Sequence, residues 1–366
     1  MSPNLKKNFS NLLLKWNLDQ NIRQMPWKGE KDPYKIWLSE IILQQTRVEQ
    51  GLDYYNRFIK TFPNINLLAN APEEKVFKMW EGLGYYSRCR NLIASAKYIS
   101  KKRKGKFPET YDEIKSLKGI GPYTAAAIGS FAFNLPYAVV DGNVFRVLAR
   151  VFGVSKPIDS TEGKKYFSAL AGELIDKKNP GIYNQAIMDF GAVVCKPISP
   201  LCSTCVFKKS CSAFKNELTG ELPVKKKKIS IKKRWFYYFV FICGNEFAIR
   251  QRVGKDIWQN LYEFPMVEST KALIQENILQ VAGEAGILKV GKPGPVDISP
   301  LLRQQLSHQL IMAQFITIRL TKKPALQNWT WVSKSKMNQF AFPGIINQFF
   351  QSGENSPVYL KVKTAI

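Results

Sequence analysis

Residues 117–124 have the sequence Leu117-Lys118-Gly119-Ile120-Gly121-Pro122-Tyr123-Thr124 and join one helical pattern to the next. The two glycines permit a tight turn with positive φ, and Pro122 presets the first turn of the following helix. Backbone N–H groups left free at that helix start could hold a phosphate. Taken alone, the pattern equally describes a plain helical hairpin. The segment 82–88, Gly-Leu-Gly-Tyr-Tyr-Ser-Arg, favours nucleic-acid binding, because aromatic rings that can stack on bases lie beside a basic residue.

The composition narrows the class of protein. At about 150 residues per domain, 366 residues suggest two domains. Lys and Arg total 54 against 28 for Asp and Glu, and this net charge of +26 favours a polyanionic partner, first of all nucleic acid. A solvated basic surface is the alternative. The single histidine, His308, argues against His-based catalytic triads and His-rich metal sites.

The sequence predicts no membrane partner and no export. The longest apolar run, Phe236–Cys243, is far shorter than the ~20 residues that a membrane helix needs. The first residues lack the apolar segment of a secretory signal. We therefore expect a cytoplasmic protein.

Hydrophobic periodicity divides the chain into two parts with a basic segment between them. Residues 1–214 are expected to be helical, 215–234 to form a basic linker, and 235–366 to form an α+β domain. Within the last part, strands joined by a turn at Gly244-Asn245 come first, and a single helix is expected near 335–350. Further helices are predicted at 34–48, after an Asp32-Pro33 cap, and at 73–81, 88–102, 122–132, 143–152, 161–177, 180–192 and 270–286.

Four of the six cysteines lie close together in the sequence. Cys195, Cys202, Cys205 and Cys211 have the spacing C-x6-C-x2-C-x5-C. Four thiolates at this spacing suit either a tetrahedral zinc ion or an iron–sulfur cluster, and the spacing alone does not decide between them. Two disulfides are a third possibility, although nothing else indicates an oxidising compartment.

Two acidic residues are candidates for catalysis. Asp141 ends an apolar run and begins a helix, where an N-cap is the simplest explanation. Glu40 lies at the margin of the apolar stripe around Trp37, where partial desolvation would raise its pKa, although a surface position is the alternative. The pair is a candidate for glycosidic bond cleavage, which typically uses one carboxyl as acid and another as nucleophile or ion-pair partner.

Together, these segments resemble the MutY-type adenine DNA glycosylases of the helix-hairpin-helix superfamily. The residues from about 258 to 265 resemble the Nudix-like domain of the same family more loosely. The matching stretches cover most of residues 20–211 and are 23–27, 32–48, 82–88, 117–124, 140–146 and the four cysteines.

The resemblance implies a fold, an activity and a cofactor. The fold is an all-α helix-hairpin-helix glycosylase domain with an iron–sulfur cluster loop, followed by an α+β Nudix-like domain. The activity is monofunctional hydrolytic removal of adenine mispaired with 8-oxoguanine, or guanine, in duplex DNA during base excision repair. The four cysteines would hold a [4Fe–4S] cluster, and the protein would act as a nucleoid-associated monomer.

The resemblance also implies roles for individual residues. Glu40 would protonate adenine, and Asp141 would stabilise the sugar cation or form a covalent intermediate, with support from Tyr123 and Asn143. Residues expected to contact DNA are Trp27, Gly119 and Gly121, with Gln45, Thr46 and Tyr85 beside the lesion, Arg23 and Gln185 in the adenine pocket, and Ser307 and His308 at 8-oxoguanine. Two residues depart from the family pattern: Leu306 replaces a frequent Phe, which puts an aromatic contact in doubt, and Lys118 replaces a usual Pro.

Three other functions each fit part of the sequence. An endonuclease III-like glycosylase/lyase needs a nucleophilic lysine where this chain has Tyr123, and a tyrosine cannot form a Schiff base. A Nudix pyrophosphohydrolase needs a metal-binding R-E-x-x-E-E core that residues 271–288 lack. A DNA-binding redox sensor would not need Glu40 and Asp141.

Overall fold

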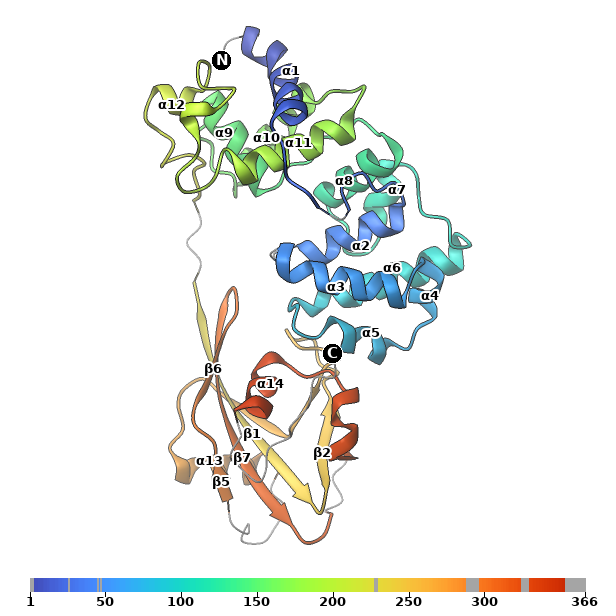
Figure 1. Ribbon diagram of the computed structural model, residues 1–366. Coiled ribbons are helices and arrows are strands. Elements are labelled where there is room, and N and C mark those ends of the chain that lie inside the picture. Colours follow the sequence, from blue (N-terminus) through green and yellow to red (C-terminus); the bar gives the residue numbers. More distant parts are fainter. Residues whose placement is uncertain are drawn as a thin grey trace. The chain divides into compact units, whose positions relative to one another are not determined.

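The computed structural model describes residues 3–25, 27–44, 46, 48–226, 230–287, 296–323 and 329–352 (Figure 1). Packing divides the chain into two compact units. The first unit comprises Met1–Asn70 with Asn91–Lys228, and the second comprises Ala71–Arg90 with Ile229–Ile366. Residues 71–90 therefore belong with the C-terminal half, an association that the sequence pattern does not indicate. The domain boundaries expected above stay a prediction.

The described elements of the first unit are helical, as expected. The bounds of α8, α9 and α11 agree with the predicted helices to within a few residues. The helices are α1 (Pro3–Asp19), α2 (Pro33–Leu43), α3 (Val48–Thr61), α4 (Ile65–Asn70), most of α6 (Tyr86–Lys102), α7 (Tyr111–Ser116), α8 (Pro122–Phe133), α9 (Gly142–Phe152), α10 (Thr161–Leu174), α11 (Pro180–Val193), the 3-10 turn η1 (Cys202–Thr204) and α12 (Ser212–Lys215).

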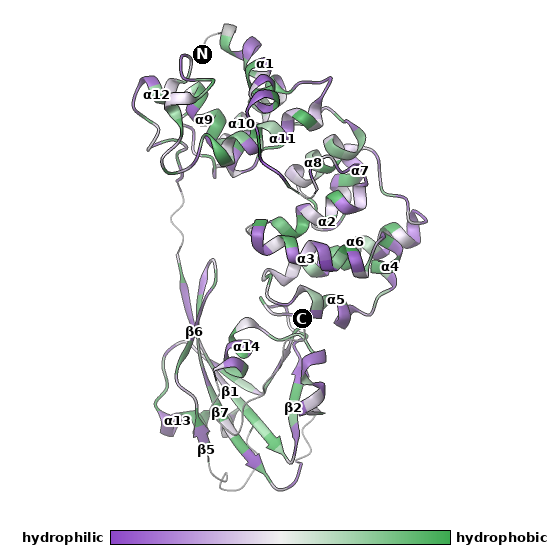
Figure 2. Cartoon of the chain, viewed as in Figure 1, coloured by the Kyte–Doolittle hydropathy of each residue, from purple (hydrophilic) through white to green (hydrophobic). Residues whose placement is uncertain are grey.

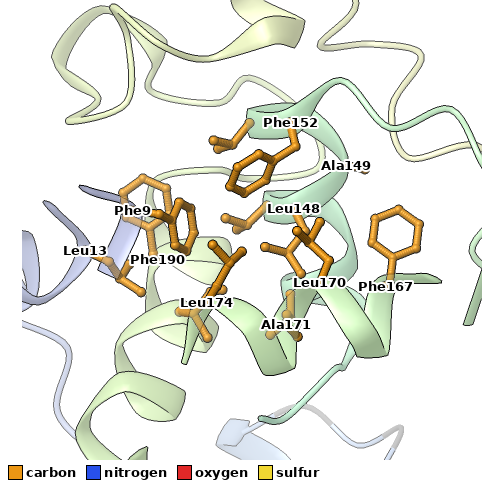
Figure 3. Close-up of a cluster of buried hydrophobic side chains, with 14 of the residues drawn as sticks. Phe9, Leu13, Leu148, Ala149, Phe152, Phe167, Leu170, Ala171, Leu174 and Phe190 are labelled. Carbon is orange, nitrogen blue, oxygen red and sulfur yellow. The ribbon is translucent and has the colours of Figure 1, made fainter. Parts of the chain in front are cut away.

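An apolar core joins α1, at the start of the sequence, to helices α9, α10 and α11 near the end of this unit. Phe9 of α1 stacks on Phe207 at 4.8 Å between ring centroids, and Phe207 in turn meets Phe190 of α11 edge-on. Leu148 of α9 and Leu170 of α10 are buried in the same cluster (Figure 3). This core fixes α9, which begins directly after Asp141, and α11, which carries Gln185.

The turn before α8 forms the expected hairpin. Gly119 has φ +83°, and a Cβ there would lie only 2.6 Å from Cβ of Asn91. Gly121 differs from the expectation, because its φ of −94° is one that any residue can adopt. Pro122 occupies the first turn of α8. Of the two glycines, only Gly119 is required by backbone conformation.

The second unit contains a mixed sheet in the order β3-β2-β1-β7-β5. Its central strands β1 and β7 run parallel, with Lys232 opposite Gln309 and Cys243 opposite Leu320. The apolar residues of β1 are visible in Figure 2. The elements are α5 (Glu73–Trp80), β1 (Lys232–Cys243), β2 (Glu246–Gln251), β3 (Tyr262–Glu263), β4 (Met266–Ser269), α13 (Gln275–Glu284), β5 (Val296–Ile298), β6 (Leu302–Gln305), β7 (Gln309–Leu320), β8 (Thr330–Ser333), the 3-10 helix η2 (Lys334–Gln339) and α14 (Gly344–Gln351).

The last expected helix is wrong as a single element. The structure has η2, a break at 340–343 and then α14, which Pro343 caps. Proline disfavours helix in the residue before it and lacks a donor, so it ends one helix and begins another. The turn expected at Gly244 between β1 and β2 is present, with φ +59°. Among the described residues, no helix has the length and apolar character needed to cross a bilayer.

Candidate active site

The two candidate carboxylates, Glu40 and Asp141, interact in the first unit. Glu40 lies in the last turns of α2, and Asp141 immediately precedes α9. Tyr123, in the first turn of α8, hydrogen-bonds to Glu40. Three separate helices thus meet at one polar site inside an apolar framework. A hydrogen bond of 3.2 Å from Gln44 Nε2 to Thr124 Oγ1, next to Tyr123, fixes the end of α2 against the start of α8.

Burial governs the ionisation of Glu40. The pKa of Glu40 is raised to about 7, mainly by desolvation and in smaller part by the negative charge of Asp141, while the Tyr123 hydrogen bond opposes the rise. A carboxylic acid with this pKa holds its proton over part of the neutral range and can release it to a base. The site therefore offers a proton donor at neutral pH.

Asp141 is the N-cap of α9 and is also part of the site. Its carboxylate accepts hydrogen bonds from the Val144 backbone N–H and from Asn143 Nδ2, each at 2.8 Å. Burial raises the pKa of Asp141, while these hydrogen bonds lower it. Arg146 Nη2 donates to Asn143 Oδ1 at 2.8 Å, so the amide of Asn143 must turn its N–H₂ toward Asp141. The capping explanation is correct, and the same carboxylate also acts on Glu40 through its negative charge.

Helix α11 closes one side of the site. The Tyr123 hydroxyl lies 3.5 Å from Sδ of Met188. A Cβ at Gly191 would lie 2.6 Å from Cβ of Asn143, so α11 approaches the start of α9 closely. One turn before Met188, Gln185 lies on the same side of the helix.

The two residues expected in an adenine pocket meet at a third residue that the sequence analysis missed. Asp189 of α11 is fully buried and accepts hydrogen bonds from Arg23 Nη1 at 2.8 Å and Gln185 Nε2 at 2.9 Å. Its signal in the sequence was an acid in an otherwise apolar stretch of helix, four residues after Gln185.

Two other residues of this unit that are expected near DNA, Trp27 and Thr46, make contacts with other parts of the unit. Trp27 is buried against Tyr55, with the rings edge-on at 5.5 Å. Thr46 follows α2 and is partly buried, with its backbone N–H bonded to the Leu43 carbonyl. Gln45 lies outside the described residues.

The four clustered cysteines line one cavity of about 20 Å³, together with Arg150 and Lys208. All four are free thiols. Within the described ranges, no three His, Cys, Asp or Glu side chains are placed to hold a single metal ion. Four cysteine side chains around one cavity are a ligand set that either a zinc ion or an iron–sulfur cluster can take.

The surroundings of these sulfurs also fit a positively charged group. Burial and the neighbouring cysteines raise the pKa of Cys205 to about 11, so thiolates here need cationic compensation. The Phe207 N–H donates to Cys205 Sγ at 3.4 Å, and Arg150 Nη1 lies 3.6 Å from Cys195 Sγ.

Helix α9 connects the cysteine loop to Asp141. Arg146 Nε donates to the Cys195 carbonyl at 2.7 Å, and Arg150 donates to the carbonyls of Lys196 at 2.7 Å and Pro197 at 3.1 Å. Both arginines are almost completely buried. The helix that Asp141 caps therefore also supports the loop that carries the cysteines.

The second unit contains a separate pocket of about 810 Å³. Three segments line it: 82–87, 255–259 and 304–309. Arg90 Nη1 donates to the Gln259 carbonyl at 2.9 Å, and Asp256 accepts from Arg234 Nη1 at 3.2 Å, so the wall at 255–259 is fixed from two sides.

Three residues expected at the lesion lie at this pocket. Ser307 and His308 are exposed and form the turn between β6 and β7, closed by the Leu306 N–H bond to the Gln309 carbonyl at 2.8 Å. The Tyr85 hydroxyl hydrogen-bonds to Ser307 Oγ. Tyr85 has φ +47°, an unusual value for an aromatic residue. The structure thus brings Tyr85 and Ser307 together from segments more than two hundred residues apart.

Comparison with known proteins identifies the family. The model of the HhH-GPD superfamily base excision DNA repair proteins matches residues 38–172, and the model of the NUDIX domain matches 237–352. The chain is 34% identical over 325 residues to an adenine DNA glycosylase of Buchnera aphidicola subsp. Baizongia pistaciae, covering 87% of this chain and 88% of that protein. The chain belongs to the adenine DNA glycosylase family.

Another relative bears the same name, and solved structures show the same fold over about 60% of the chain. The mouse protein is 40% identical over 223 residues, covering 58% of this chain and 43% of that one. The structure of a thermostable thymine-DNA glycosylase has a TM-score of 0.54 at 30% identity and covers 58% of this chain and 98% of its own. A trapped endonuclease III–DNA intermediate, at 20% identity and TM-score 0.52, covers 60% of this chain and 99% of its own and shows the same fold.

Membership in the adenine DNA glycosylase family confirms three expectations. The first is the resemblance itself. The second is the fold class, an endonuclease III-like helical domain followed by a Nudix-like domain with a mixed sheet. The third is the enzyme class, a DNA N-glycosylase of base excision repair.

Proposed function

We propose that this adenine DNA glycosylase extrudes adenine mispaired with 8-oxoguanine, or with guanine, from duplex DNA and removes it by hydrolysis. The observation that carries the proposal is the Glu40–Tyr123–Asp141 arrangement, in which one carboxyl has its pKa raised to about 7 beside a second, hydrogen-bonded carboxylate. Relatives named adenine DNA glycosylase supply the identity of the base.

Glu40 supplies the proton in this mechanism. A base within duplex DNA must be extruded before an enzyme reaches its glycosidic bond. Adenine is a poor leaving group as an anion, and transfer of the Glu40 proton to a ring nitrogen lets it leave as a neutral molecule. The hydrogen bond from Tyr123 holds the carboxyl in place and afterwards stabilises the carboxylate.

Asp141 stabilises the sugar as the bond breaks. The C1′–N bond cleaves with its electron pair passing to adenine, and the sugar becomes an oxocarbenium ion. The Asp141 carboxylate, oriented by Val144 and Asn143, supplies the compensating negative charge. Water then adds at C1′, its proton passes to the Glu40 carboxylate left by the first step, and an abasic site remains.

Tyr123 makes the enzyme monofunctional. Lyase chemistry requires an amine that forms a Schiff base with the opened sugar. Tyr123 occupies the lysine position of the lyase pattern and donates its hydroxyl to Glu40 instead. Borohydride should accordingly trap no more than a trace of covalent enzyme–DNA adduct, and efficient trapping would overturn this assignment.

Discrimination of 8-oxoguanine is assigned to the pocket of the second unit. 8-Oxoguanine differs from guanine in an N7–H donor and an O8 acceptor, and a serine hydroxyl can pair with either. Ser307, His308 and Tyr85 line that pocket. The hairpin at Gly119 and Gly121 and the net charge of +26 would serve the DNA backbone without regard to sequence.

The cysteines Cys195, Cys202, Cys205 and Cys211 would hold a [4Fe–4S] cluster. When bound, the cluster would supply a structural crosslink that orders the loop and its lysines, Lys208 and Lys209. The test is metal analysis of the purified chain, with about four irons expected. One zinc and no iron would overturn the cluster assignment and leave the carboxylate chemistry untouched.

The decisive test of the activity uses three duplexes that differ in one base pair. Each carries a single A:8-oxoguanine, A:G or A:T pair, and alkali reveals abasic sites after incubation with the chain. We expect cleavage of the first two and little of the third. Equal cleavage of all three, or none, would refute the proposed substrate. Action as a monomer, associated with the nucleoid in the cytoplasm, belongs to the same proposal.

A further inference from the structure

Asp189 gathers four hydrogen-bond donors around one buried carboxylate. Oδ1 accepts from Arg23 Nη1 at 2.8 Å and from Gln185 Nε2 at 2.9 Å. Oδ2 accepts from Asn21 Nδ2 at 2.9 Å and lies 3.4 Å from Lys28 Nζ. The Asp189 side chain is 0% exposed, whereas those of Arg23 and Lys28 are 26% and 29% exposed. Two of the four donors therefore extend from a buried anchor toward solvent.

The anchor determines how the Gln185 amide is oriented. A carboxylate can only accept hydrogen bonds, so Gln185 must direct its N–H₂ group at Asp189 and its carbonyl oxygen away. In the described part of the chain, that oxygen has no hydrogen-bond partner. The same holds for Nε and Nη2 of Arg23, because only Nη1 is bound. Asp189 Oδ1 thus places one free acceptor beside free donors.

Helix α11 links this acceptor–donor pair to the catalytic carboxylates. Met188 precedes Asp189 on α11, and its sulfur is 3.5 Å from the Tyr123 hydroxyl that bonds to Glu40. Gln185 is three residues before Met188 and so lies on the same side of α11, one turn away. A base whose ring nitrogen reaches Glu40 would have its six-membered ring within reach of this turn.

We propose that Asp189 is a positioning residue that makes the site select a 6-amino purine. This inference rests on the proposed function and deepens it. The Watson–Crick edge of adenine has a donor at N6 and an acceptor at N1, which matches the Gln185 carbonyl and the Arg23 guanidinium. The 6-oxopurines have the reverse order, with an acceptor at O6 and a donor at N1. Both pairings then become repulsive.

The size of the effect follows from hydrogen-bond discrimination. A matched pair of hydrogen bonds typically favours the correct base by about 10–100-fold. The ratio of adenine to hypoxanthine excision opposite 8-oxoguanine should therefore depend on Asp189, although Asp189 does not contact the base. A residue that only stabilises the fold would slow both reactions equally.

The experiment measures single-turnover release of adenine and of hypoxanthine from otherwise identical duplexes. The test variant is Asp189→Asn, whose amide cannot accept from all four donors and so releases the Gln185–Arg23 pair. We expect the adenine-to-hypoxanthine ratio to fall by about 10–100-fold. Glu173→Gln is the matched control: it removes the same unit of charge from an exposed acid paired with Lys6, and its ratio should equal that of the wild type.

A second variant keeps the proposal testable if Asp189→Asn does not fold. Gln185→Leu leaves Asp189 with three donors, and it should lower the ratio to a similar extent. The double variant should lower it no further, because both changes remove one interaction. An unchanged ratio in Gln185→Leu, or equal slowing of both bases in a folded Asp189→Asn, would overturn the inference. If the wild type releases no adenine, the proposed function fails first, and the two failures are thereby distinguished.

Discussion

Removal of the Tyr123 hydroxyl should shift the pH dependence of catalysis. The hydrogen bond from Tyr123 stabilises the ionised form of Glu40 and so holds its pKa down to about 7 against the effects of burial and Asp141. A hydrogen bond to a charged group contributes about 1.5–3 kcal/mol. At 1.36 kcal/mol per unit, its loss in Tyr123→Phe should raise the pKa of Glu40 by about 1–2 units.

The assay is the single-turnover rate of adenine release between about pH 5.5 and about pH 9. In the wild type, the rate should level off below pH 7 and fall above it, because only protonated Glu40 can donate. In Tyr123→Phe, the midpoint of the fall should move upward. The matched control is Tyr183→Phe, which removes a buried hydroxyl that has no hydrogen-bond partner in the described part of the chain and should leave the midpoint unchanged. An unchanged or lower midpoint in Tyr123→Phe would refute the reasoning.

The remaining predictions concern the two carboxylates and the lesion pocket. Glu40→Gln should retain mismatch binding and lose excision, because glutamine has no proton to give. The raised pKa makes ionisation of Glu40 unfavourable in the folded state. The free energy of unfolding of Glu40→Gln should therefore exceed that of the wild type by at most about 3 kcal/mol above pH 7 and match it below pH 4.5. Equal stability of the two proteins at every pH would contradict this. Asp141→Asn should slow excision at least about a hundredfold while thermal stability changes little, because asparagine also caps helices; a loss confined to stability would mean that Asp141 only caps α9. Replacing Ser307 and His308 with alanine should slow excision opposite 8-oxoguanine far more than opposite guanine, and equal slowing of both would show that the turn only supports the fold.

The sequence predicted the features that depend on neighbouring residues. The hairpin at Gly119, the caps of α2 and α9, and the turn at Gly244 are determined by residue types within a few positions. Where two local signals competed, the prediction failed. The apolar pattern from 335 to 350 suggested one helix, but Pro343 divides it into two.

Contacts between distant segments could not be predicted in this way. Residues 71–90 belong to the second unit because Glu81 accepts from the Phe342 N–H at 2.8 Å and from Asn347 Nδ2 at 3.0 Å. The Asp189 cluster likewise unites α11 with a loop more than 160 residues earlier in the chain. Hydrophobic periodicity does not predict such pairings, and the sequence therefore indicated Glu40 and Asp141 but not Asp189, which positions Arg23 and Gln185.

The arginines of α9 restrict how this family can change over evolution. Arg146 and Arg150 are buried, and the carbonyls of residues 195–197 are among their acceptors. Deletion of the whole cysteine loop would remove these carbonyl acceptors from two buried cations, at a cost of several kcal/mol. Loss of the cysteines alone leaves those carbonyls in place. Relatives that have lost the cysteines should therefore keep the loop as a support for these arginines, and those that delete the loop should have exchanged both arginines for smaller, uncharged residues.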